Sequence, residues 1–379
     1  MEGLEPTAGW TNTQPWRGLL GVAITLGIAF TVTAAFNMQT YLGFFTDILM
    51  SNVPILVILT LGLQCQFPST EGLPRPWGAF LMTAFVMVIG FIMSHALVYF
   101  LADGVATPFI HVQAILTVIV TFFLVIAFGM WPFDKMSLAA KGFLTLISAY
   151  IIAWLLFQLF NFSLLSHPDA AIPSAVGPVP FYAKGGPLEP FAALAPMGPV
   201  TWEVALEFSF CVLIFLFNFA VLQMWPFHKF PGIMKQPTLG IVLTITCFVL
   251  GLILHFIAVG ALKIAPLMFL LYGICYLFGL LMFMTMLQMW PGRNLKSPAA
   301  CGFVNIILAI IVGVVAFYVI RAFCASHFGA EAFKHPADVF SMGNLMLGIT
   351  FPLWAAYSAL WDFWPLQPSP PPPPPPEEA

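Results

Sequence analysis

Charged side chains are scarce in this chain. Only 7% of its 379 residues are Asp, Glu, Lys or Arg, whereas 61% are hydrophobic and the mean hydropathy is +0.98. A soluble domain carries about 25% charged residues. The composition therefore excludes an ordinary water-soluble protein. It also excludes a basic surface for binding nucleic acid, so no nucleic-acid partner is expected.

Sequence signatures of common enzyme classes are also missing. The chain has no glycine-rich phosphate loop, no nucleophile elbow and no zinc-protease helix motif. Its six cysteines are scattered and include no Cys-x-x-Cys pair, which argues against a zinc knuckle or a disulfide framework. No catalytic residue is predicted, and an enzyme is the less favoured class.

Long apolar runs are what the chain has in abundance. A bilayer core of about 30 Å requires roughly 20 apolar residues in a helix. Backbone polar groups in lipid must be bonded within their own segment, so such runs are helical. The sequence predicts an all-α polytopic membrane protein, surrounded by the lipid bilayer, with ten transmembrane helices at approximately 17–37, 44–66, 78–101, 108–131, 142–164, 203–225, 238–261, 266–290, 301–323 and 342–364.

Every second apolar run ends at a Trp-Pro or Phe-Pro dipeptide, which we call a corner. The corner prolines are Pro68, Pro132, Pro226, Pro291 and Pro365. They recur with a period of about 64 residues, which insertions lengthen in two repeats. Two spans in each period predict parallel helical-hairpin repeats. Within the transmembrane domain, residues 17–366, the five repeats cover approximately 17–68, 76–133, 141–227, 237–292 and 298–366. Each corner is interpreted as an interfacial anchor and a helix stop.

Three segments lie outside the spans. They are an N-terminal segment (1–16), a Pro- and Gly-rich loop (165–201) and a polyproline tail (367–379). The loop contains eight prolines, so it cannot be a helix, and it is interpreted as a surface where a protein partner on the outer side could dock. Of the twelve Lys and Arg residues, eight lie on the side of the predicted membrane that carries the corners and four lie on the opposite side. This bias predicts a multi-pass cell membrane protein with both termini in the cytoplasm.

Polar side chains recur at one position of the second helices, which we call the polar register. Asp47, His111 and Asn344 each precede their corner proline by the same number of residues, about six helical turns. In the third repeat, Glu203 and Glu207 lie two residues before and two residues after this position. Polar groups inside a membrane are costly and often mark a solute or proton pathway. We expect these residues to bind the solute in a polar vestibule that opens to the outside.

The first helices carry polar groups at a similar expected depth. Asn37 and Asn161 lie equally far beyond the early glycine of their helix, and His95 and His255 lie slightly closer to theirs. With a helical rise of about 1.5 Å for each residue, all four should lie in the outer third of the bilayer. The two asparagines would extend the solute-binding layer. The two histidines would suit a pair of axial haem ligands, or they link helices through hydrogen bonds.

Together these features favour a permease or channel-like transporter for a small neutral or weakly charged solute, with no cofactor. A strongly ionic solute would need a counter-charge at mid-depth. One alternative is a membrane subunit of a redox complex that binds haem b or quinone. Another is a structural subunit of a membrane assembly. The sequence decides neither the solute nor whether a metal is bound.

Overall fold

The computed structural model describes residues 13–162, 189–329 and 337–366. Within these residues, ten helices are long and apolar enough to cross a membrane, and this confirms the number of predicted spans. Residues 1–12 of the N-terminal segment, most of the loop 165–201 and the tail 367–379 lie outside the described residues.

Each predicted span corresponds to one helix or to consecutive helical pieces. The α-helices are α1 (Trp16–Ala34), α2 (Met38–Thr40), α3 (Thr46–Val57), α4 (Arg75–Ala102), α5 (Pro108–Phe122), α6 (Leu138–Phe157), α7 (Trp202–Val221), α8 (Thr238–His255), α9 (Pro266–Thr285), α10 (Pro298–Phe328), α11 (Ala337–Gly343) and α12 (Phe351–Ala355). Segments of π-helix extend or join them at Ile58–Gly62, Phe123–Ala127, Phe256–Ala261, Asn344–Thr350 and Ala356–Leu360, and the segment Tyr41–Phe45 contains a kink at Gly43. Short 3-10 turns lie at Glu189–Leu194, Phe227–Lys229 and Gly292–Asn294, and strands β1 (Phe160–Asn161) and β2 (Val200–Thr201) form one parallel pair.

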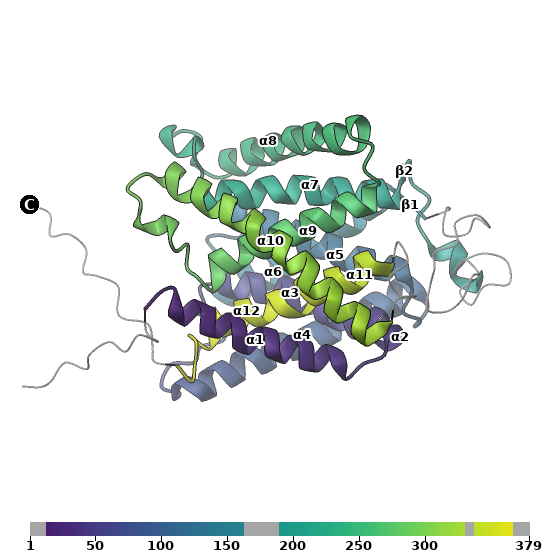
Figure 1. Ribbon diagram of the computed structural model, residues 1–379, viewed down its shortest axis with the longest axis horizontal. Coiled ribbons are helices and arrows are strands. Elements are labelled where there is room, and N and C mark those ends of the chain that lie inside the picture. Colours follow the sequence, from purple (N-terminus) through teal and green to yellow (C-terminus); the bar gives the residue numbers. More distant parts are fainter. Residues whose placement is uncertain (1–12, 163–188, 330–336, 367–379) are drawn as a thin grey trace, which may run out of the picture.

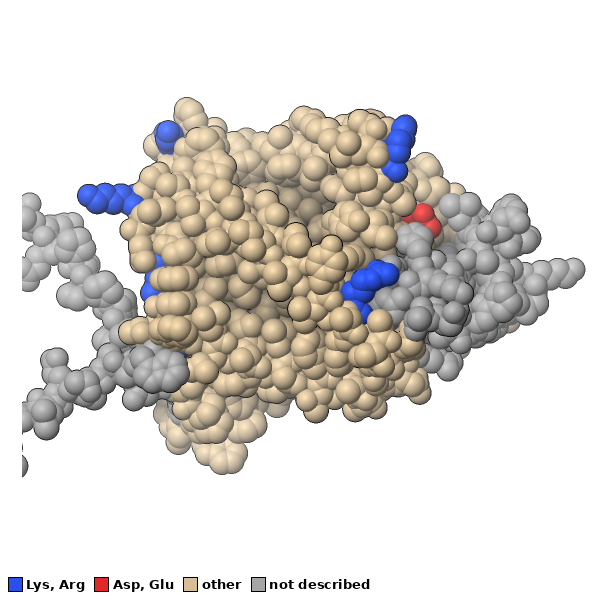
Figure 2. All heavy atoms as spheres, in the orientation of Figure 1, with Lys and Arg blue, Asp and Glu red and all other residues tan. Residues whose placement is uncertain are grey.

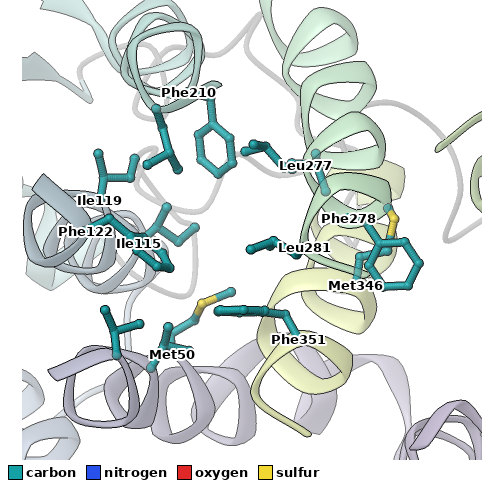
Figure 3. Close-up of a cluster of buried hydrophobic side chains, with 14 of the residues drawn as sticks. Met50, Ile115, Ile119, Phe122, Phe210, Leu277, Phe278, Leu281, Met346 and Phe351 are labelled. Carbon is teal, nitrogen blue, oxygen red and sulfur yellow. The ribbon is translucent and has the colours of Figure 1, made fainter. Parts of the chain in front are cut away.

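The spans form an inner and an outer layer that alternate along the chain. The inner spans contain α3, α5, α7, α9 and the run from α11 to α12, and 61% to 78% of their apolar stretches is buried. The outer spans are α1, α4, α6, α8 and α10, with 22% to 33% buried. Each inner helix contacts the next, and the last run contacts both α9 and α3. The inner helices therefore close into a ring, seen in the close-up of Figure 3.

Each outer helix packs mainly on the inner helix that precedes it in the chain. Thus α4 packs on α3, α6 on α5, α8 on α7 and α10 on α9. The first helix, α1, has no predecessor and packs on α12 and the adjoining segment Asn344–Thr350. The chain therefore closes on itself, with its first span against its last (Figure 1). The pairs that pack most closely, such as α3 with α4, are joined by a corner. The two helices of each predicted hairpin, such as α4 and α5, are joined instead by a loop at the other end of the bundle.

The corners share a backbone shape. Two consecutive residues with positive φ precede every corner, at Gln64-Cys65, Gly129-Met130, Gln223-Met224, Gln288-Met289 and Asp362-Phe363. The second residue of most pairs donates its N–H to the carbonyl six residues back, for example Met130 to Leu124 at 2.8 Å. This bond is one residue wider than the bond of a Schellman helix end, which runs five residues back. The inner helices thus stop before the Trp-Pro or Phe-Pro bond, which is cis, and end a few residues earlier than the sequence predicted.

Charged side chains lie toward the two ends of the described structure. Figure 2 shows Lys and Arg near both ends, with a broad band between them on this face where the described residues carry neither blue nor red. Large apolar side chains such as Phe248 and Ile310 are exposed on the outer helices. Such a belt is typical of a surface that faces lipid. Below, the end that carries the Trp-Pro and Phe-Pro corners is called the corner end, and the other is called the loop end.

Candidate functional site

Three polar side chains from three inner spans meet inside the bundle. Nδ1 of His111 on α5 lies 3.0 Å from Oδ1 of Asp47 on α3. Its Nε2 lies 3.2 Å from Oδ1 of Asn344, which follows α11. All three residues are buried. They lie equally far along the chain from their corner prolines, and the two contacts of His111 show that they meet at one height.

This cluster can hold a proton between Asp47 and His111. In the assigned orientation Oδ1 of Asn344 accepts a hydrogen bond from Nε2–H of His111. Nδ1 then either donates to the Asp47 carboxylate or accepts from the protonated acid. Both arrangements carry no net charge, so the pair can be buried without an uncompensated ion. The carboxylate also fixes the orientation of the imidazole ring.

Glu207 belongs to a second cluster, between α7 and the outer helix α8. Its Oε2 shares a hydrogen bond with Nδ1 of His255 at 2.6 Å, and its Oε1 accepts one from the Cys211 thiol at 2.9 Å. Glu207 is fully buried, and the His255 side chain is 16% exposed. The carboxylate therefore points out of the inner ring, and the structure does not bring it together with Asp47. The expected single vestibule is divided into two sites.

The remaining candidates lie at the loop end. Oδ1 of Asn37 caps α2 by accepting from the backbone N–H of Thr40 at 2.9 Å. Asn161 pairs with Thr201 in the short sheet. Both follow the end of their outer helix, because α1 stops at Ala34 and α6 at Phe157, contrary to the expected position inside the span. Glu203 lies in the first turn of α7 and is partly buried.

The two histidines considered as haem ligands have different surroundings. His95 is exposed on α4, and its Nδ1 donates to the Phe91 carbonyl at 2.8 Å. His255 is held by Glu207 on α8. Figure 1 shows α4 and α8 on opposite sides of the bundle, so one haem cannot lie between these rings. Within the described ranges, no group of three or more His, Cys, Asp or Glu side chains is arranged to hold a metal ion.

A cavity lies inside the inner ring, and the sequence analysis did not identify it. Its empty space, including the part that is open to solvent, is about 670 Å³, and all five inner spans contribute to its lining. Figure 3 shows side chains such as Met50, Ile119, Phe210 and Leu277 directed toward this central space. Among the described residues that line it, Asn344 is the polar side chain. Asn344 thus connects the cavity to His111 and Asp47.

The cavity lining follows the polar register. On α9, the lining residues begin at the register position and continue toward the corner; they are Leu270, Ile274, Leu277 and Leu281. On α5, His111 occupies the register position, and the lining residues at the equivalent later positions are Ile115, Val118 and Phe122. Steps of four, three and four residues follow one face of a helix. Extending the polar register along this face would have predicted the lining.

We found no protein-family model, curated protein or solved structure that matches this chain. The ten long apolar helices of the described residues indicate an integral membrane protein by composition and length. Any finer assignment of function must be argued from the cavity and the two polar clusters.

Proposed function

We propose that this protein is a channel-like transporter, or permease, for a small neutral or weakly charged solute. The observation that carries the proposal is the cavity within the inner ring, which Asn344 connects to His111 and Asp47. A solute moving along the ring axis would meet this polar cluster and then the apolar cavity. The described lining residues offer no counter-charge, so a neutral species is favoured over an ion.

The same proposal gives the other polar residues a location and a role. Glu203, Asn37 and Asn161 would contribute polar groups near the loop end, where the solute enters. Glu207 and His255 would hold α8 against the ring, because their hydrogen bond joins two helices. No cofactor is included, so the purified protein is expected to show no Soret band. A Soret band lost in His255→Ala would favour the redox alternative.

We infer further that the chain consists of five copies of one two-helix unit. The shared backbone of the corners, the common register of the polar residues and the cyclic order of helix contacts support this. The excess of Lys and Arg on the corner side supports a cytoplasmic location for both termini. The loop 165–201 would then face outside and remain a candidate docking surface for a protein partner.

Flux through proteoliposomes tests the transport proposal. The full chain is reconstituted, and the entry of glycerol, urea, the neutral amphipathic 1,2-pentanediol and acetate is followed by stopped-flow light scattering. At least one of these solutes should enter about tenfold faster than into empty liposomes, which corresponds to a barrier lower by about 1.4 kcal/mol. Chloride and potassium should show no increase.

A cavity-filling variant provides the matched comparison. Leu277 is 1% exposed and lines the cavity, so Leu277→Trp should return the flux to the level of empty liposomes. Ile245 is 59% exposed on α8, and the same change there should leave the flux intact. Equal flux in wild type and Leu277→Trp would contradict a path through the cavity. Flux equal to that of empty liposomes for every solute would contradict the transport proposal.

A further inference from the structure

The chemistry of the cavity restricts the kind of molecule that can occupy it. Its lining consists of Leu, Ile, Val, Met and Phe side chains with Gly343 and Asn344. Water needs two to four polar partners to be retained in a buried space, so an apolar cavity of this kind stays dry. A polar solute would lose its hydration there without replacement hydrogen bonds. An apolar molecular body, in contrast, gains contact with every wall.

Asn344, the polar side chain among the described lining residues, lies at the level of the polar register. Asn344 is held by Nε2 of His111, whose ring is held in turn by Asp47. This chain of hydrogen bonds fixes the amide at the level of the polar register. The lining residues closer to the corners, such as Phe122, Leu281 and Phe351, are apolar. The cavity therefore has one polar side chain at the level of the polar register, and the rest of its lining is apolar.

We propose that the cavity is a binding site for one neutral amphipathic molecule, with its hydrocarbon or aromatic body among the Phe, Leu and Ile side chains and its uncharged polar group at Asn344. The empty space of about 670 Å³ includes the part that is open to solvent, so the occupant must be a small molecule. The inference deepens the proposed transport function, since it names the class of solute. It concerns binding alone and can be tested without measuring flux.

Photolabelling with a matched pair of probes tests this site. The probes are 4-(trifluoromethyl-diazirinyl)benzyl alcohol, which is neutral, and the corresponding benzoic acid, which is anionic at pH 7. The full chain in phospholipid nanodiscs is irradiated with each probe, and the labelled residues are mapped by mass spectrometry. Lipid-facing residues such as Ile245 will be labelled in proportion to probe concentration. Labelling of Phe210, Leu277 and Phe351 by the alcohol should saturate and be competed by benzyl alcohol.

The expected difference between the two probes is large. The benzoate should label the cavity residues about tenfold less than the alcohol does, because burying a charge without a partner is costly. Leu277→Trp should abolish the saturable labelling, and Ile245→Trp should preserve it. Phe210→Ala, which enlarges the cavity, should preserve the saturable labelling of Leu277 and Phe351, and a melting temperature of Leu277→Trp close to that of the wild type would exclude misfolding as the cause of its loss. Asn344→Leu should reduce the competition by benzyl alcohol more than the competition by toluene.

Several outcomes would overturn the inference. Labelling of the cavity residues that is not competed by benzyl alcohol would show that no binding site exists. Equal labelling by the alcohol and the benzoate would contradict a neutral occupant. Saturable labelling in detergent that disappears in phospholipid nanodiscs would assign the cavity to a lipid acyl chain. Saturable labelling without any solute flux would leave the binding site standing and overturn only the transport proposal.

Discussion

Arg17 at the start of α1 contacts Asp362 at the last corner of the chain. Nη2 of Arg17 lies 3.0 Å from Oδ1 of Asp362 and donates also to the Asp362 backbone carbonyl at 3.0 Å. The guanidinium carbon lies 4.5 Å from the centre of the Phe363 ring. Arg17 is 2% exposed although it is charged. This contact fastens the first span, in the outer layer, to the end of the last inner span.

Loss of the Arg17 contact should destabilise the whole bundle. Arg17→Met is expected to lower the free energy of unfolding by about 1.5 to 3 kcal/mol, the range for hydrogen bonds to charged groups. The Asp362 side chain is 40% exposed, which places the effect toward the lower value because water screens the charge. Thermal unfolding in detergent measures it. Arg293→Met, at an exposed residue of the corner end, is the control, and an equal loss there would contradict the role of Arg17 in fastening α1 to the last span.

Asp47 and His111 should be energetically coupled. A double-mutant cycle with Asp47→Asn and His111→Ala is expected to give a coupling energy of about 1 kcal/mol, in the range measured for hydrogen bonds between transmembrane helices. Unfolding by titration with SDS provides the free energies. Asp47→Asn and Glu207→Gln should instead be additive, because these residues have different hydrogen-bond partners. Additivity in the first cycle would show that the pair contributes nothing to stability.

Substitutions of His255 and of Glu207, the two partners in the second cluster, should lower the stability of the protein by different amounts. His255→Ala leaves the fully buried Glu207 carboxyl without its imidazole partner, and a buried polar group left without a partner costs about 1 to 3 kcal/mol. Glu207→Gln keeps the volume and a hydrogen-bonding oxygen, so a smaller loss is expected. The melting temperatures of the two variants test this order. The reverse order would indicate that Cys211 and the helix backbone already satisfy Glu207.

Two glycines set the close approach of α9 and α10. A methyl group at Gly279 would meet the backbone carbonyl of Ala309, and one at Gly313 would meet that of Cys275. Each Gly→Ala change should destabilise the protein by about 1 to 3 kcal/mol, because backbone must move to make room. Gly27 has nothing within 4 Å of the added methyl, and Gly27→Ala should gain roughly 0.5 to 1 kcal/mol from helix propensity. Equal melting temperatures for all three variants would contradict this account.

Cys65 offers a test of membrane orientation. Among the six cysteines it alone is partly exposed, at the end of an inner span, whereas the other five are buried. Burial raises the pKa of the Cys65 thiol, so little thiolate is present at pH 7 and maleimide labelling should keep accelerating beyond pH 9. A membrane-impermeant maleimide should label it in inside-out vesicles, and Cys65→Ser should abolish the signal. Labelling in right-side-out vesicles would reverse the proposed orientation.

The polar register shows what could be read from the sequence at the site. The common spacing from each corner proline predicted that Asp47, His111 and Asn344 share one depth, and the structure brings these three together. Glu207 lies two residues from that register, and a shift of two residues on a helix turns a side chain by about 200°. It therefore points to α8 instead of the ring. Depth follows from counting residues, whereas direction depends on helix rotation.

Helix formation was predictable because it is local. A run of about 20 apolar residues in lipid has no alternative to a helix, so the ten spans were fixed by composition alone. The helices are apolar on almost every face, so the sequence carries little periodic signal for which face is buried. The division into inner and outer layers, the contact of α1 with α12 and the central cavity were decided only by tertiary packing. Side chains of helices distant in sequence must fit together there, and no single segment specifies that fit.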